Sequence, residues 1–301
     1  MIESGILKEF NSTILDNQSD EGGIFFGIDN LNYDLSFQNT ILMGNSALSC
    51  LISIENSANI YFINVTFINN KNLLFSTASS KVYLLSSTIF DLNCDNIISA
   101  CLAYFTEKAS LIIDSVYIKN VTHSSAEGGI RMENSFLNVS KTSLMNLKTV
   151  KKLGSCFSGI NSKFEIFNIS VQNYEINCIF LRESYFNLTQ SFFVINDEVY
   201  LNKLEKAIQN FGTIWCENCY SLNIKNSFFG SNQVTDGGAI TLSSLNFSKE
   251  NKIEGSIFIK NKASNKGGAL LLLNTNLRIF NCLFVNNLAK EGGSIFYQGL
   301  N

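Results

Sequence analysis

One pair of cysteines has a spacing that could do chemistry. Cys216 and Cys219 follow Trp215 with two residues between them, which is the spacing of a redox-active dithiol or of half a zinc site. A dithiol site needs a helix after the motif, but an apolar strand pattern begins at Ser221. A zinc site needs two more ligands, and the single histidine, His123, lies far away in the sequence. We therefore predict no metal and no cofactor, and two interpretations stay open: a local Cys216–Cys219 disulfide in a secreted protein, or two small buried residues.

Carboxylates, which glycoside hydrolases use in pairs, are scattered along the chain. Adjacent acids occur only at Asp20-Glu21 and Asp197-Glu198, and both pairs fall at the edges of expected loops. No stretch of the sequence carries a catalytic signature, so we expect no enzymatic activity and no catalytic residues. The alternative is a carbohydrate-active enzyme, a polysaccharide lyase or hydrolase, whose site is assembled from several repeats and is therefore invisible in the sequence.

A charged residue precedes each of three Gly-Gly pairs near the C-terminus. These residues are Asp236, Lys266 and Glu291, and they occupy equivalent positions in successive repeats. Stacked repeats would bring them together as acid, lysine, acid, an order that relieves repulsion between like charges. Three acids in the column would have favoured calcium, whereas the lysine favours a solvated column of charges.

Sequons for N-glycosylation occur throughout the chain. They begin at Asn11, Asn17, Asn64, Asn120, Asn138, Asn168, Asn187 and Asn246. Asparagine, serine and threonine are so abundant that sequons arise by chance, and Asn11, Asn64 and Asn168 fall at expected bends. If any sequon is used, Asn138 and Asn246 are the favoured sites.

These residues are carried by a repeat, which is clearest between Ser221 and Tyr297. Each clear copy has an apolar pair followed by Phe-x-x-Asn and then by Gly-Gly. The three copies contain Phe229, Asn232, Gly237 and Gly238; Phe258, Asn261, Gly267 and Gly268; and Phe284, Asn287, Gly292 and Gly293. The final Asn position of the pattern recurs along the whole chain at Asn17, Asn45, Asn70, Asn93, Asn120, Leu147, Tyr174, Asn196, Asn232, Asn261 and Asn287.

The spacing within the repeat predicts short strands separated by bends. The apolar pair is two residues apart and so faces one side of a strand, whereas the following steps of three residues break that alternation. Asparagine suits the bends because it tolerates left-handed backbone, and Gly-Gly marks a further bend or a close backbone approach. Two or three strands in each repeat predict a parallel β-helix of about 11 coils. Its phenylalanines would stack inside, and its asparagines would bond from coil to coil.

The combination of Phe-x-x-Asn with Gly-Gly-Ala-Ile or Gly-Gly-Ala-Leu over residues 220–297 resembles the repeat of the polymorphic outer membrane proteins. These are autotransporter adhesins with a pectin-lyase-like passenger domain. The resemblance implies an all-β, right-handed parallel β-helix and a role in adhesion. A leucine-rich repeat horseshoe is the alternative fold, because it has a similar period and also uses asparagine. That repeat requires Leu-x-x-Leu-x-Leu-x-x-Asn, which differs from the spacing here.

Composition favours one elongated domain over residues 1–301, with an inserted loop or short amphipathic helix at 197–213. A net charge of −3 argues against a nucleic-acid surface, and no apolar run is long enough to span a membrane. The first residues lack the apolar core of a signal peptide. Because β-helix ends need covering, we expect a segment of a longer chain, with further coils or capping segments at both ends.

These observations predict a non-enzymatic β-helix rod, located outside the cell or at its surface, for adhesion, ligand presentation or coat structure. Its expected partners are proteins or glycans that contact many repeats at once. Besides the enzyme alternative, a structural spacer within a larger assembly stays open.

Overall fold

The chain forms strands joined by bends, and a computed structural model describes residues 6–19, 24–27, 33–54, 58–94, 100–123, 128–149, 156–174, 177–195, 211–244 and 251–299. No helix occurs among these residues, and in this part of the chain no segment could cross a membrane as an apolar helix. The chain divides into two compact units, unit 1 (Met1–Gly154) and unit 2 (Ser155–Asn301).

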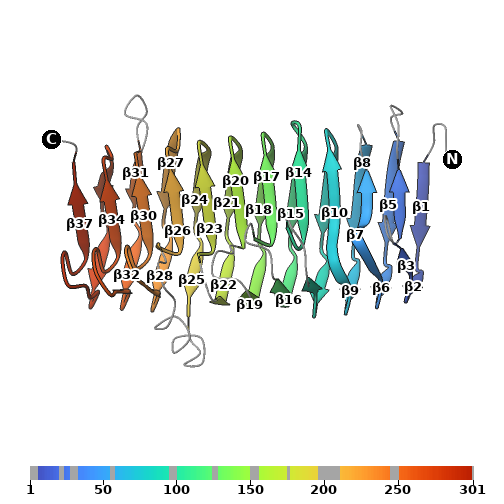
Figure 1. Cartoon of the computed structure of the whole chain (residues 1–301), viewed down its shortest axis with the longest axis horizontal. Coiled ribbons are helices and arrows are strands. Elements are labelled where there is room, and N and C mark those ends of the chain that lie inside the picture. The colour runs from blue at the N-terminus through green and yellow to red at the C-terminus, as the bar shows by residue number, and fades with distance from the viewer. Residues whose placement is uncertain are drawn as a thin grey trace. The chain divides into compact units, whose positions relative to one another are not determined.

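Unit 1 repeats three strand positions, so that its strands form three rows (Figure 1). The first row contains β1 (Ile6–Phe10), β5 (Tyr33–Gln38), β8 (Ala58–Ile63), β11 (Lys81–Leu85), β15 (Ser110–Asp114) and β18 (Phe136–Ser140). The second contains β2 (Thr13–Leu15), β6 (Ile41–Met43), β9 (Thr66–Ile68), β12 (Thr88–Phe90), β16 (Tyr117–His123) and β19 (Ser143–Thr149). The third contains β3 (Gln18–Ser19), β4 (Phe25–Gly27), β7 (Ser46–Ile54), β10 (Lys71–Ala78), β13 (Asn93–Cys94), β14 (Ala103–Thr106) and β17 (Ile130–Glu133).

Unit 2 has the same three rows. The first contains β21 (Lys163–Phe167), β24 (Tyr185–Thr189), β27 (Ser221–Lys225), β31 (Lys252–Glu254) and β35 (Arg278–Phe280). The second contains β22 (Ser170–Tyr174), β25 (Phe192–Val194), β28 (Phe228–Gly230), β32 (Ile257–Ile259) and β36 (Leu283–Val285). The third contains β20 (Phe157–Ile160), β23 (Ile179–Arg182), β26 (Ile214–Glu217), β30 (Ile240–Ser243), β34 (Leu270–Leu273) and β37 (Ile295–Gln298), and a small additional pair is formed by β29 (Gln233–Val234) and β33 (Lys262–Ala263).

Neighbouring strands of a row pair in parallel, as β8, β11 and β15 do in unit 1 and β28, β32 and β36 do in unit 2. This confirms the predicted all-β parallel β-helix. The predicted number of about 11 coils is an approximate count. Three rows of strands without a helix are not the horseshoe of a leucine-rich repeat. The right-handed winding stays a prediction, as does a single domain over 1–301.

The first bend of each coil has left-handed backbone, for which asparagine is suited. The φ angles lie between 47° and 59° at Asn11, Asn39, Asn64, Ser86, Ser115, Lys141, Asn168, Gln190, Asn226, Gly255 and Asn281. Immediately after this bend, the hydroxyl of a buried serine or threonine forms hydrogen bonds with backbone groups. Ser227 Oγ, for example, donates to the Lys225 carbonyl and accepts from Ser191 N of the preceding coil. The hydroxyl therefore links the bend both to its own coil and to the preceding coil.

The second bend carries a ladder of asparagines, of which Asn45, Asn70, Asn232 and Asn261 are buried. In unit 2, Asn232 Nδ2 donates to Asn261 Oδ1 at 2.7 Å, and Asn261 Nδ2 donates to Asn287 Oδ1 at 3.0 Å. In unit 1, Asn17 and Asn45 bond in the same way, and Asn45 bonds the next asparagine, Asn70. Each side chain satisfies polar groups of the adjacent coil that the solenoid interior would otherwise leave without partners.

The ladder is shorter than the sequence template implies. At two positions the template selects Asn93 and Asn120, but the inward side chains are those of Leu92 and Val121, each about 1% exposed. Asn120 instead occupies the left-handed bend and donates to Asp91 Oδ1. In these middle coils of unit 1, apolar side chains fill the interior at this bend. The asparagine therefore takes the neighbouring position in the chain, after Leu92 in one coil and before Val121 in the next.

Phenylalanine stacks fill the core of unit 2. The rings of Phe193, Phe229, Phe258 and Phe284 lie on one another with centroids 4.8–5.3 Å apart and nearly parallel planes. The Gly-Gly bend beside this stack is tightly packed, because a Cβ atom on Gly238 would lie 1.9 Å from the carbonyl oxygen of the next coil's glycine. Close backbone approach therefore explains the second glycine of the pair.

Candidate ligand-binding surface

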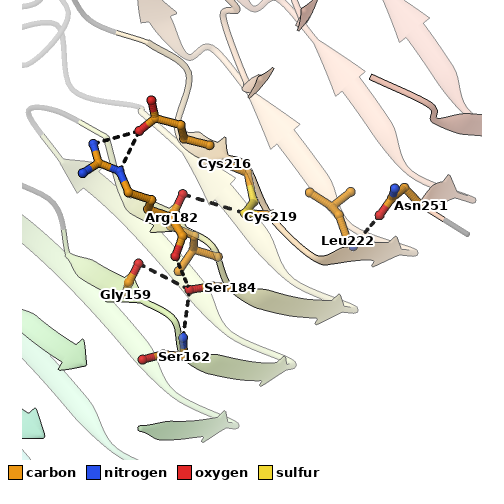
Figure 2. The surroundings of a disulfide bond; sticks show 10 residues. Gly159, Ser162, Arg182, Ser184, Cys216, Cys219, Leu222 and Asn251 are labelled. Carbon is orange, nitrogen blue, oxygen red and sulfur yellow. Dashed lines mark hydrogen bonds and ion pairs between the residues drawn. A yellow bond between two sulfur atoms is a disulfide. The ribbon is translucent and has the colours of Figure 1, made fainter. Parts of the chain in front are cut away.

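A disulfide fixes the end of strand β26. Cys216 and Cys219 are both buried and are joined by a disulfide across the bend between β26 and β27, with left-handed backbone at Asn218 (Figure 2). The Cys219 Sγ lies 3.8 Å from the Leu181 carbonyl oxygen of the preceding coil. With both sulfurs bonded to each other, the pair holds the bend after β26 and offers no thiolate to a metal.

Side chains alternate along β23 and β26, so that every second residue points out of the solenoid. On β23 the outward residues are Phe180 and Arg182, whereas Ile179 and Leu181 are buried. On β26 the outward residues are Trp215 and Glu217. The parallel register places Phe180 beside Trp215 and Arg182 beside Glu217. Two strands thus present a pair of aromatic rings followed by a pair of opposite charges.

The aromatic rings form one continuous group. The Phe180 and Trp215 centroids are 4.6 Å apart, and the Phe211 and Trp215 centroids are 4.5 Å apart. All three residues are half-buried. Phe211 is held there because the adjoining backbone N–H of Gly212 donates to the Thr241 hydroxyl. Tilted ring packing at these distances stabilises such a group while leaving part of each ring in contact with solvent.

The charged pair follows the rings along the paired strands β23 and β26. Figure 2 shows Arg182 reaching toward the carboxylate of the neighbouring strand. Arg182 donates through Nε to Glu217 Oε2 at 2.9 Å, and a second guanidinium nitrogen lies 2.8 Å from the same oxygen. The Arg182 guanidinium carbon is 5.8 Å from the centre of the Phe180 ring. The two side chains are 46% and 32% exposed, so their remaining donors and acceptors reach solvent. We call Phe180, Arg182, Phe211, Trp215 and Glu217 the Arg182 cluster.

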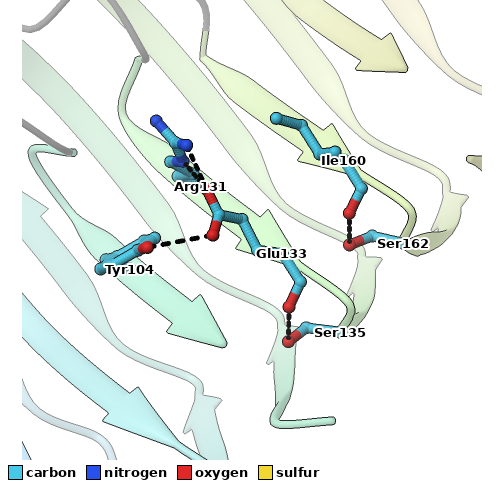
Figure 3. Close-up of polar contacts among 6 residues, drawn as sticks. All are labelled: Tyr104, Arg131, Glu133, Ser135, Ile160 and Ser162. Carbon is cyan, nitrogen blue, oxygen red and sulfur yellow. Dashed lines mark hydrogen bonds and ion pairs between the residues drawn. The ribbon is translucent and has the colours of Figure 1, made fainter. Parts of the chain in front are cut away.

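A related cluster lies on the third row of unit 1 (Figure 3). Arg131 donates through Nε to Glu133 Oε1 at 2.7 Å, and the Tyr104 hydroxyl donates to Glu133 Oε2 at 3.1 Å. Burial, followed by the negative charge of Glu133, raises the pKa of Tyr104 above its ordinary value of 10.0, so the hydroxyl stays a donor. The Arg131 side chain is only 16% exposed. The charged side chains of this cluster are more buried than those of the Arg182 cluster.

The charged residues before the Gly-Gly bends are stacked in the predicted order, but the lysine side chain lies on an aromatic ring. The backbone N–H of Lys266 donates to Asp236 Oδ1 at 3.0 Å, but the Lys266 ammonium lies over the Phe296 ring, 4.6 Å from its centre. Glu291 is bridged to Lys266 through the backbone. In the part of the chain that the structure describes, no three metal-ligating side chains come together.

The remaining predicted positions are placed as follows. Asn138 lies on the outer side of β18 and is half-buried, whereas Asn246 lies outside the described residues. The predicted insertion at 197–213 falls largely on residues 196–210, also outside them, and its last part contributes Phe211, which bridges Asp236.

Sequence reasoning missed a second disulfide and the Arg182 cluster. Cys94 and Cys101, seven residues apart, are bonded to each other, and both are buried. The short separation and the even number of cysteines were the available signals. The Arg182 cluster draws on two strands separated by a long insertion, so its members become neighbours only through the register of β23 and β26.

Comparisons with known proteins assign no family. No family model matches the chain, and no curated protein matches it. Among solved structures, one that is similar is QnrB1, a plasmid-mediated fluoroquinolone resistance protein, with 10% sequence identity and a TM-score of 0.19. The match covers 69% of this chain and 100% of that one. A TM-score this low carries no argument about function.

Proposed function

We propose that this protein is a non-enzymatic β-helix, outside the cell or at its surface, that binds glycans through the Arg182 cluster. The observation that carries the proposal is the line of three rings, Phe180, Trp215 and Phe211, next to an exposed Arg182–Glu217 pair. An aromatic face offers apolar area to the C–H face of a sugar ring. The guanidinium and carboxylate supply fixed donors and acceptors for sugar hydroxyls.

The composition of the cluster supports binding over hydrolysis. The usual mechanisms of glycoside cleavage require two carboxyl groups on opposite sides of the scissile bond. The Arg182 cluster contains one carboxylate, Glu217, and both of its bonds go to the Arg182 guanidinium. A second acid of suitable geometry is not a member of this cluster, so we propose recognition without chemistry.

The disulfides support a location in an oxidising compartment. Cys94–Cys101 and Cys216–Cys219 are both closed in the structure, and structural disulfides persist mainly in secreted and surface proteins. The asparagine ladders and the stacked rings make the scaffold rigid, which limits the ordering entropy lost on binding. Rigid presentation suits adhesion, in which many weak contacts combine.

The test is a glycan array probed with the purified chain, followed by titration calorimetry of the best ligand. We expect saturable binding that Trp215→Ala weakens about five- to thirtyfold, since loss of one aromatic contact is worth roughly 1–2 kcal/mol. Tyr83→Ala is the matched control. Tyr83 is also an outward aromatic in a stacked pair, with Tyr61 at 4.8 Å, but it belongs to the first row of unit 1.

Three outcomes would count against the proposal. Uniform absence of binding would favour the structural spacer. Equal loss of affinity in Trp215→Ala and Tyr83→Ala would show that the Arg182 cluster is not the site. Release of reducing ends or unsaturated products from any bound polysaccharide, measured in the same samples, would replace the proposed binding role with the carbohydrate-active enzyme.

A further inference from the structure

Two cysteines that are not in disulfides lie on successive coils of unit 2 at the same position of the repeat. Cys156 immediately precedes β20 and Cys178 immediately precedes β23, and these strands pair from Phe157 with Ile179 onward. The backbone confirms that the register extends to the cysteines, because Phe157 N donates to the Cys178 carbonyl oxygen at 2.9 Å. Cys156 and Cys178 are therefore side by side on adjacent strands.

The two thiols face each other in the interior. Cys178 is fully buried and Cys156 is 9% exposed. Burial, followed by the neighbouring Cys156 side chain, raises the pKa of the Cys178 thiol well above its ordinary value. Residues in register on neighbouring strands have Cα atoms about 4.8 Å apart, which falls within the range that a disulfide spans. No backbone rearrangement is needed to bring the sulfurs into bonding range, beyond rotation of the side chains.

We propose that Cys156 and Cys178 form a third disulfide, which links two successive coils of unit 2. It differs in kind from the two disulfides already closed. Those join residues seven and three positions apart, and each closes a loop within a coil. A Cys156–Cys178 bond would instead join one coil to the next, and it would enclose the strands β20, β21 and β22, which lie between the two cysteines in the chain.

The reaction is a thiol–disulfide exchange with a low-molecular-weight disulfide such as glutathione disulfide. One cysteine thiolate attacks the oxidant and releases one glutathione thiolate, and the second cysteine thiolate then displaces the other. Two thiols are oxidised to one disulfide, one disulfide is reduced to two thiols, and the two protons go to the departing glutathiones. Burial raises the pKa of the Cys178 thiol, so it is protonated and unreactive once the coils have closed. The bond must therefore form during folding.

The direct test is to refold the full chain in a glutathione redox buffer, block remaining thiols with N-ethylmaleimide in denaturant, and map its tryptic peptides without reduction. Cleavage after Lys152, Lys163 and Arg182 places the two cysteines in adjacent peptides. We expect these peptides to appear linked, lighter than the sum of their masses by two hydrogen atoms. N-ethylmaleimide on both cysteines, or pairing of either with a different cysteine, would overturn the proposal.

A stability measurement separates the bond from simple burial. In oxidised protein, Cys156→Ala, Cys178→Ala and the double variant should lower the melting midpoint by nearly the same amount, about 5 °C, because each breaks the same crosslink. Additive losses from the two single variants would contradict the bond. Cys282→Ala is the control, because the Cys282 thiol bonds the Ile253 carbonyl oxygen and takes no part in the proposed crosslink. The change in midpoint that it causes should therefore be the same in oxidising and in reducing buffer.

Discussion

The asparagine ladder of unit 2 makes a sharp prediction for Asn261→Ala. The Asn261 side chain is completely buried and serves both neighbouring coils. Its Oδ1 accepts from the backbone N and from Nδ2 of Asn232, at 3.2 and 2.7 Å. Its Nδ2 donates to the Phe229 carbonyl oxygen and to Asn287 Oδ1, both at 3.0 Å. Alanine removes all four of these bonds and leaves the groups of the adjacent coils in place.

The magnitude follows from the groups left without these partners. The Asn232 backbone N–H and the Phe229 carbonyl each lose a buried bond, and an unsatisfied buried polar group costs about 1–3 kcal/mol. Two such groups give an expected loss of about 2–6 kcal/mol in the free energy of unfolding. The exposed Asn276, in the loop between β34 and β35, provides the matched substitution, and Asn276→Ala should stay within about 0.5 kcal/mol of wild type.

The assay is urea unfolding followed by circular dichroism, with the three proteins measured side by side. The ladder argument requires a clearly lower urea midpoint for Asn261→Ala alone. If Asn261→Ala and Asn276→Ala unfold at the same urea concentration, the buried amide contributes nothing beyond an exposed one, and the reasoning is wrong. A folded Asn261→Ala protein with an altered m-value would instead indicate that the two-state treatment fails.

Two further substitutions test other parts of the fold. Gly238→Ala should prevent close stacking of the Gly-Gly bend, because its Cβ would lie 1.9 Å from the Gly268 carbonyl oxygen, and should destabilise the protein by more than about 3 kcal/mol. Gly293→Ala should be tolerated, because the added Cβ would lie 3.7 Å from its nearest neighbouring atom. Thermal melts of both variants test this difference in stability. Asp114 tests pH dependence: the hydrogen bond from Ser140 lowers the pKa of its carboxyl below the ordinary 3.8. Its stabilisation is present above that value and is lost as the pH falls through the lowered pKa. Between neutral pH and pH values below 3.8, Asp114→Asn should therefore lose less unfolding free energy than wild type. The difference between the two losses should be under about 1 kcal/mol, because the Asp114 side chain is partly exposed. Equal losses in urea titrations at acid pH would contradict this.

The fold was predictable because each coil repeats the same local physics. Strand alternation, a left-handed bend and a Gly-Gly bend leave a periodic mark that needs no knowledge of distant contacts. The register was less certain. At Leu92 and Val121 an apolar residue lies inside where the sequence pattern selects a neighbouring asparagine, because interior packing in those coils, rather than residue type, decides which side chain turns inward.

The candidate site was not predictable for a related reason. Arg182 and Glu217 are 35 residues apart, and nothing in the repeat marks either of them. Only the pairing of β23 with β26 brings Phe180 and Arg182 beside Trp215 and Glu217. Sequence composition could show that arginine is scarce. It could not show that two of the three arginines, Arg131 and Arg182, lie beside an aromatic ring and a glutamate.

Trp215 is the only tryptophan in the chain, so its fluorescence reports on the Arg182 cluster alone. The decisive measurement is a fluorescence titration with the best glycan from the array, run with acrylamide quenching. Glycan stacked on the cluster should shift the emission saturably and protect Trp215 from the quencher, with the midpoint matching the calorimetric affinity. A glycan that binds by calorimetry but leaves both the emission and the quenching of Trp215 unchanged would contradict the proposed site.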